Sequence, residues 1–141
     1  MLPIPKSRGK AIQTAILVIS LSMWIYNQAD GTLQHDDEPA GTGYSGFGEG
    51  KNNPEMQTLH DVGPIPEGTY EIGPPHNTDT HGPHVMALTP ADGTETFGRS
   101  GFLIHGDSVA HPGTASHGCI ILPRTVRDAI SASGDTLLQV V

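Results

Sequence analysis

The residues with the clearest capacity for chemistry lie in one stretch near the C-terminus. This stretch, FLIHGDSVAHPGTASHGCI, covers residues 102–120 and contains the only cysteine of the chain, Cys119. His105 lies upstream of the cysteine, at the end of the apolar run FLI. A cysteine attacks as its thiolate, and a nearby imidazole lowers the thiol pKa and later returns a proton to a leaving amine. The stretch therefore predicts a Cys119 nucleophile with His105 as its base.

The turn directly before Cys119 supplies supporting groups. Gly118 frees the backbone to turn inward, so the N–H groups of Gly118 and Cys119 are candidate donors to an oxyanion. We expect Ser116 to stabilise this turn through a hydrogen bond from its side chain to the backbone. His117 is assigned to the thiol environment or to a loop hydrogen bond, and His111, in the loop upstream, to solvent.

Two other interpretations of these residues stay open. A lone cysteine that opens an apolar run is often a buried small hydrophobe, which would leave a non-catalytic binding module. Alternatively, histidines and the cysteine could surround zinc in a hydrolase. The ligands available for such a site are His76, His81, His84, His105, His111, His117 and Cys119. Their spacing matches no zinc ribbon, zinc finger or HExxH helix, so we predict neither a metal nor another cofactor.

Arg99, in the segment FGRSGF, is a candidate substrate-binding residue. A guanidinium in a cleft can hold a carboxylate through two parallel hydrogen bonds. The competing interpretation is a salt bridge at the edge of a strand.

Composition limits the class of protein. A chain of 141 residues corresponds to one domain with a modest core. Its 18 glycines and 12 prolines, with only 5% aromatic residues, favour short strands joined by many turns. The net charge of -8 offers no basic face to phosphates, so nucleic acid is not an expected partner. A single cysteine cannot form an internal disulfide.

The elements that must position the candidate residues are short strands. Period and turn signals predict strands at 23–28, 32–36, 69–72, 84–90, 101–105, 119–122 and 136–141. Residues 37–56 and 74–83 are expected to be loops, since both are rich in Gly, Pro or Asn. One short helix should follow Pro123 and stop at Gly134, with Val126, Ala129 and Ile130 on its inner face. The predicted fold class is mainly β, a β-rich α+β domain.

Residues 1–22 form an expected N-terminal leader. Lys6, Arg8 and Lys10 precede the apolar run AIQTAILVISLS, which is too short for a comfortable membrane span. The segment is typical of a secretory signal, but Met23 could instead be the true start, or the run could belong to the core. All three interpretations place the working domain at residues 23–141.

Four blocks of this sequence resemble a known family. His105 followed by Ser-His-Gly-Cys resembles the signature of L,D-transpeptidases, the cysteine enzymes that act on bacterial peptidoglycan. More specifically, the small L,D-transpeptidase-like effectors of type VI secretion are similar to this chain over nearly all of residues 23–141. The blocks that carry this resemblance are GTGYSGFGEGKNNP, GPIPEGTY, FGRSGFLIHGD and PGTASHGCIIL.

The resemblance implies an L,D-transpeptidase-like catalytic fold in which Cys119 is the nucleophile and His105 the base. The substrate would be a peptidoglycan stem tetrapeptide, attacked at the L-centre of meso-diaminopimelate with loss of the terminal D-alanine. Water would then complete an L,D-carboxypeptidase reaction, and a free D-amino acid would complete an exchange. The protein would be secreted and act in the periplasm of a target bacterium. Its further partners would be secretion machinery and an immunity protein.

Two departures from wall-building L,D-transpeptidases favour the effector branch. Only ten residues, 106–115, separate His105 from Ser116, which is a shorter connection than those enzymes have. Ile121 stands where they often carry a basic residue. Both features argue against ordinary cross-linking, which needs room and contacts for a second stem peptide.

Overall fold

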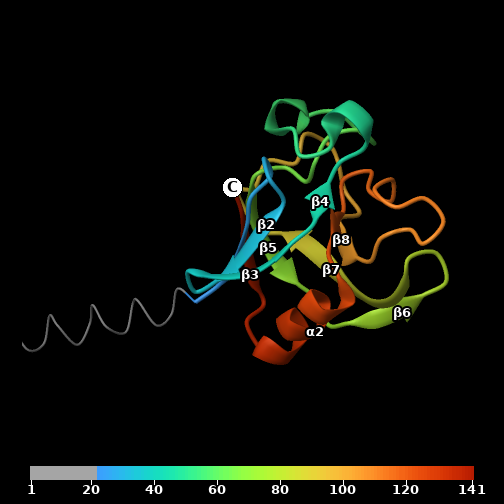
Figure 1. The fold of residues 1–141 in the computed structure, drawn as a ribbon. Coiled ribbons are helices and arrows are strands. Elements are labelled where there is room, and N and C mark those ends of the chain that lie inside the picture. Colours follow the sequence, from blue (N-terminus) through green and yellow to red (C-terminus); the bar gives the residue numbers. More distant parts are fainter. Residues whose placement is uncertain (1–21) are drawn as a thin grey trace, which may run out of the picture.

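The computed structural model describes residues 22–141 (Figure 1). The expected leader therefore lies outside the described residues, apart from Ser22. No helix in the described part of the chain has the length and apolar character needed to cross a bilayer. In chain order the elements are β1 (Trp24–Tyr26), β2 (Thr32–His35), β3 (Glu38–Thr42), β4 (Tyr44–Ser45), the 3-10 helices η1 (Gly48–Gly50) and η2 (Pro54–Met56), β5 (Gly68–Ile72), β6 (His76–Thr78), β7 (Gly82–Pro90), β8 (Leu103–His105), β9 (Ile120–Ile121), α2 (Arg124–Ser133) and β10 (Leu137–Val140).

The described strands form one mixed sheet in the order β3-β2-β1-β10-β5-β7-β8-β9-β4, and β6 pairs with β7 beside this path. A sheet with one α-helix among the described residues confirms the expected mainly β class. Strand periodicity builds the core, because alternate side chains of a strand point to the same face. Trp24 and Tyr26 of β1 are buried in this way, as are Leu138 and Val140 of β10.

Helix α2 follows the predicted limits closely. Pro123 occupies the N-cap position, and Gly134 ends the helix in the left-handed conformation, with φ of 77°. Val126 and Ile130 pack into the core as expected, and burying each contributes about 1.5–3 kcal/mol.

The inner face of α2 differs from the prediction at one position. Ala129 is exposed, and Arg127 is buried in its place with 6% of its surface accessible. A cationic side chain is not expected on a buried face from hydrophobic periodicity, so the sequence pattern missed this residue.

The two segments predicted as loops contain regular structure. Residues 37–56 hold β3, β4 and both 3-10 helices, and residues 74–83 hold β6. These strands are set by partners elsewhere in the chain, since β4 pairs with β9 and β6 pairs with β7. Short polar strands of this kind carry little period of their own, so the prediction of loops there was wrong.

The centre of the predicted site lies where β8 and β9 run parallel. Ile104 pairs with Ile120, and His105 pairs with Ile121. In Figure 1 the connection from β8 to β9, drawn in orange, and the β6–β7 hairpin project from the same side of the molecule. Residues of both segments line one cavity, and His105 lies in its wall.

Candidate active site

Cys119 and His105 belong to the same face of two neighbouring strands. Ile104 and Ile120 are a register pair buried in the core, so the residues that flank them point to the opposite face. Cys119 directly precedes β9, two positions before the register partner of His105. The parallel pairing therefore places the predicted nucleophile and base on adjacent segments of the sheet, two register positions apart, although 14 positions separate them in the sequence.

The Cys119 thiol lies in a cavity of about 350 Å³. Burial raises the pKa of Cys119, while the Leu103 N–H and the positive charge of Arg99 act in the opposite direction. The net shift is upward, so the thiol is protonated at neutral pH in the free protein. A nucleophile in this state requires a base to remove its proton.

His105 has the chemical state of such a base. Its side chain is 3% accessible, and its Nδ1 lies 2.8 Å from the Gly106 carbonyl oxygen. Because a carbonyl only accepts, Nδ1 carries the proton and Nε2 presents a lone pair. That Nε2 is buried without a hydrogen-bond partner among residues 22–141. Burial lowers the pKa of His105, so the imidazole is neutral at neutral pH.

The free protein does not hold the two groups in a hydrogen bond. Among the described residues, the thiol's hydrogen-bond contact is with the Gly101 carbonyl oxygen at 4.0 Å, and not with His105. His105 instead lines the neighbouring cavity of about 620 Å³. Contacts between a nucleophile and its base often tighten only when substrate binds, so the separation is compatible with a catalytic pair.

Ser116 organises the turn that carries Cys119. Its side chain is fully buried, and its Oγ donates to the Cys119 carbonyl oxygen at 2.6 Å. The same oxygen accepts hydrogen bonds from the N–H groups of Gly46, at 2.9 Å, and Gly118, at 3.2 Å. Ser116 thus ties the turn both to itself and to the segment after β4, as its predicted stabilising role requires.

Gly118 is needed for its conformation and for its lack of a side chain. Its φ is 134°, and a Cβ at this position would lie 2.6 Å from Nη2 of Arg99. Its N–H already donates to Ser116 Oγ. The Cys119 N–H is therefore the better candidate for the predicted oxyanion donor.

The other two histidines of the stretch lie on the surface. His117 is exposed, pairs its Nδ1 with the Asp61 carbonyl oxygen at 2.9 Å and stacks on Phe47 at 5.0 Å between ring centroids. It also lines the cavity of Cys119, where a loop-supporting role fits better than a role as base. His111 is exposed in the connection between β8 and β9.

Arg99 is buried beneath the turn, with 5% of its surface accessible. Its Nη1 donates to the carbonyl oxygens of Gln57 and Pro64, and its Nη2 to those of Gly63 and His117, at 2.6–3.4 Å. These four bonds hold residues 57–64 against the turn of Cys119. Binding of a substrate carboxylate by Arg99 stays a prediction, but its terminal donors are already engaged by the backbone.

The sequence family is decided by one comparison. The family described as the Tlde1 domain matches residues 40–136, which is more than half of the chain and includes both Cys119 and His105. The chain belongs to the Tlde1 domain family. No curated protein gives a significant match to its sequence.

Solved structures similar to this Tlde1 domain are L,D-transpeptidases. A cysteine-to-serine mutant of the Enterococcus faecium enzyme matches with a TM-score of 0.51 and 16% identity, over 85% of this chain and 49% of that one. L,D-transpeptidase 3 from Mycobacterium tuberculosis matches with a TM-score of 0.51 and 15% identity, over 85% of this chain and 60% of that one. The chain thus spans about half the length of these proteins. At this identity the likeness confirms the expected L,D-transpeptidase-like fold.

The sequence predicted no chemical or positioning role for three residues that support the candidate site of this Tlde1 domain: Ser45, Tyr44 and Asp107. Ser45 of β4 is fully buried; its Oγ donates to the Gly118 carbonyl oxygen at 3.3 Å and accepts from the Ile65 N–H at 2.8 Å. Only the antiparallel pairing of β4 with β9 brings Ser45 to the turn. A two-residue strand leaves no period that could have indicated this contact.

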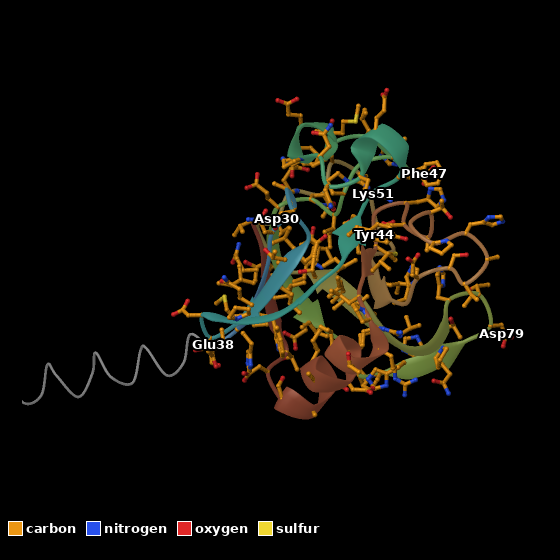
Figure 2. The ribbon with its side chains drawn as sticks, viewed as in Figure 1. Asp30, Glu38, Tyr44, Phe47, Lys51 and Asp79 are labelled. Atoms are coloured by element: carbon orange, nitrogen blue, oxygen red, sulfur yellow. The ribbon has the colours of Figure 1, made fainter. Side chains whose placement is uncertain are left out.

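Tyr44 and Asp107 fix the short connection between β8 and β9. The Tyr44 hydroxyl donates to Asp107 Oδ1 at 2.6 Å and accepts from the Ala115 N–H at 3.0 Å. Figure 2 shows Tyr44 and Lys51 together at this edge, where the Lys51 ammonium lies 4.5 Å from the centroid of the Tyr44 ring. Burial and the bond to Asp107 raise the pKa of Tyr44 to about 12, so its hydroxyl keeps its proton and remains a donor. The position of Asp107 two residues after His105, in the sequence His-Gly-Asp, could have indicated that it lies near the site.

The residues proposed for zinc do not form a metal cluster. Within residues 22–141, the side chains near enough to share an ion are His35, Asp36 and Asp135. They gather around the end of β2 and the start of β10, and none belongs to the seven candidates. The histidines and the cysteine considered for a zinc hydrolase are thus not brought together in this part of the chain.

Replacing Ser116 by alanine is expected to lower the free energy of unfolding by about 1–3 kcal/mol. The substitution leaves the buried Gly46 N–H without its acceptor and the Cys119 carbonyl without its donor. Urea unfolding of both proteins measures the difference. Ser100→Ala, at an exposed position, is the control and should change stability by less than about 0.5 kcal/mol. Equal stability of the two variants would contradict the role given to Ser116.

Proposed function

We propose that this protein is a peptidoglycan-modifying cysteine enzyme, an L,D-carboxypeptidase, an L,D-transpeptidase that exchanges D-amino acids, or both. The observation that carries the proposal concerns His105, on the strand next to the one that follows Cys119. Its Nε2 is buried without a hydrogen-bond partner among residues 22–141. A buried imidazole nitrogen without a partner is costly, and such groups persist where they serve chemistry. The L,D-transpeptidase-like fold and membership of the Tlde1 domain family support the same conclusion.

The reaction begins on the stem tetrapeptide. His105 Nε2 takes the proton of the Cys119 thiol, and the thiolate adds to the carbonyl carbon at the L-centre of meso-diaminopimelate. The oxyanion that forms accepts a hydrogen bond from the Cys119 N–H. When the carbonyl reforms, the bond to the D-alanine nitrogen breaks, and the imidazolium gives its proton to that nitrogen. The products are free D-alanine and a thioester on Cys119.

The thioester is resolved by the reverse sequence of steps. Water or the amine of a D-amino acid attacks the thioester carbonyl and loses a proton to His105, and the Cys119 sulfur leaves and regains that proton. Water yields a tripeptide, and a D-amino acid yields an exchanged tetrapeptide. Either outcome removes normal tetrapeptide donors from the wall.

An antibacterial role follows from this chemistry. We place the protein among the type VI effectors, secreted by one bacterium and acting in the periplasm of another. The connection between His105 and Ser116 supports this placement, because it is only ten residues long and the hydrogen bonds of Tyr44 and Asp107 hold it close to the domain. A producer would need an immunity protein in its own periplasm, and the secretion machinery would be a further partner.

The deciding experiment incubates the purified protein with tetrapeptide-rich muropeptides, with and without a second D-amino acid, and follows the products by mass spectrometry. We expect loss of D-alanine alone, or its replacement when the added D-amino acid is present. A chelator should leave both reactions unchanged. Binding of muropeptides without turnover would instead identify a non-catalytic module, and inhibition by the chelator would support a zinc hydrolase.

A further inference from the structure

A second buried arginine lines the cavity that also contains His105. Arg127 belongs to α2, is 6% accessible and lines the cavity of about 620 Å³ that also contains His105. Its Nε donates to the Leu122 carbonyl oxygen at 3.0 Å, and its Nη1 donates to those of Pro83, at 2.8 Å, and His84, at 3.0 Å. Three backbone contacts, two from β7 and one from the segment before α2, thus fix the plane of the guanidinium.

The remaining amino group of Arg127 is open. Its Nη2 donates to no group among residues 22–141, in contrast to Nη2 of Arg99, which meets two carbonyl oxygens. A Cβ on Gly106 would lie 2.7 Å from Arg127 Nη2, so the missing side chain of Gly106 leaves room for the guanidinium. Arg127 is therefore oriented by the protein with one donor group unused.

No carboxylate of the described residues forms a salt bridge with Arg127. Asp128, its neighbour on α2, pairs with Arg124 at 2.8 Å and acts on Arg127 only through its charge. Asp107 lines the same cavity, but its carboxylate accepts from the Tyr44 hydroxyl and from the N–H groups of Ser108 and Gly113. His81, which packs on His105 at 4.6 Å between ring centroids, provides no negative charge. A buried cation without a counter-ion is costly, and an anionic ligand would remove that cost.

The position of Arg127 relative to His105 indicates which anion fits. Gly106 joins the two residues, because its carbonyl oxygen lies 2.8 Å from His105 Nδ1 and its Cα borders Arg127 Nη2. In the proposed reaction His105 exchanges a proton with the amine of the D-amino acid that leaves or enters. The α-carboxylate of an amino acid is two bonds away from that amine, so it must lie within a few ångströms of the base.

We propose that Arg127 binds the α-carboxylate of the D-amino acid on the leaving side of the stem peptide, through its free Nη2. This inference rests on the proposed function. The same contact binds the departing D-alanine and the incoming D-amino acid. The incoming amino acid attacks by the reverse of the step that releases D-alanine, so both occupy the same position. It also predicts selectivity for a stem whose fourth residue is the last, because an additional residue would move the carboxylate away from Arg127.

The test compares the tetrapeptide with its C-terminal amide, which lacks the negative charge. The full-length protein should release the terminal residue from the acid about 10–100-fold faster than from the amide, as expected for one charge-assisted hydrogen-bond pair. Arg127→Gln should lower the rate on the acid to that on the amide and leave the rate on the amide unchanged. Arg124→Gln, one turn earlier on an exposed face of the same helix, should keep the full preference for the acid.

A binding measurement separates this inference from the proposed function. Titration calorimetry of the Cys119→Ala variant should show tighter binding of the acid than of the amide, without any turnover. Equal rates of the native protein on acid and amide would overturn the role of Arg127 while leaving the enzyme intact. Preferential binding of the acid without D-alanine release by the native protein would overturn the function and keep the carboxylate site. Should Arg127→Gln fail to fold, the comparison of acid and amide on the native protein still decides.

Discussion

Cys119→Ala is expected to abolish the release and the exchange of D-alanine, with a fall in rate of at least about 10³-fold. The reason is covalent: without sulfur no thioester forms, and no other cysteine exists in the chain to replace it. The single thiol also makes the intermediate easy to identify. Intact mass measured during turnover should show the native protein carrying one tripeptide stem and the variant carrying none.

The fold should survive this substitution, because alanine removes only the sulfur atom and leaves the bond from Ser116 to the backbone carbonyl oxygen of residue 119 intact. Circular dichroism and urea unfolding are the controls. In a Gram-negative host that exports the chain to its periplasm, growth inhibition by the native protein should disappear with the variant. Muropeptide turnover that persists in Cys119→Ala would refute the cysteine mechanism.

His105→Gln is expected to slow formation of the thioester by about 10²–10⁴-fold at neutral pH. The thiol of Cys119 has a raised pKa, so it stays protonated there unless a base removes its proton. Because the pKa of His105 is lowered by burial, the native imidazole remains neutral to a lower pH than an ordinary histidine. Native activity should therefore be retained below about pH 6.5, the usual histidine value, and fall only as the pH drops through the lowered pKa.

The deficit of His105→Gln should shrink as the pH rises. Above the pKa of Cys119 the thiolate forms without help, so the rate of the variant should climb towards that of the native protein. D-alanine release measured from pH 5 to pH 10 checks both limbs. His111→Gln, at an exposed position in the connection after β8, should follow the native profile. A constant ratio of native and variant rates across this range would mean that His105 does not act as the base.

Strand positions near the site were predictable because apolar runs mark the strands and turn-forming residues mark their ends. The apolar runs that end at His105 and begin at Cys119 became β8 and β9, and the Pro-to-Gly interval after them became α2. The contributions of Ser45 and Tyr44 were not predictable, since β4 exists only through its pairing with β9. The burial of Arg127 was not predictable for a different reason. Its guanidinium donates to backbone carbonyl oxygens, including one in the distant strand β7, and a hydrophobic pattern contains no information on such partners.

The amino-acid sequence was sufficient for the mainly β class, for the choice of Cys119 and His105 as reactive candidates and for the stabilising role of Ser116. These follow from short-range chemistry: strand and turn preferences, the reactivity of thiol and imidazole, and hydrogen bonds within one turn. The tertiary structure decided which donors are already used and which are free. Carbonyl oxygens far away in the chain engage Arg99, and a bond within the turn engages the Gly118 N–H. Among residues 22–141, His105 Nε2 and Arg127 Nη2 are left without hydrogen-bond partners. In the proposed reaction these two groups take the thiol proton and bind the substrate carboxylate, because a polar group without a partner in the protein can gain one from a ligand.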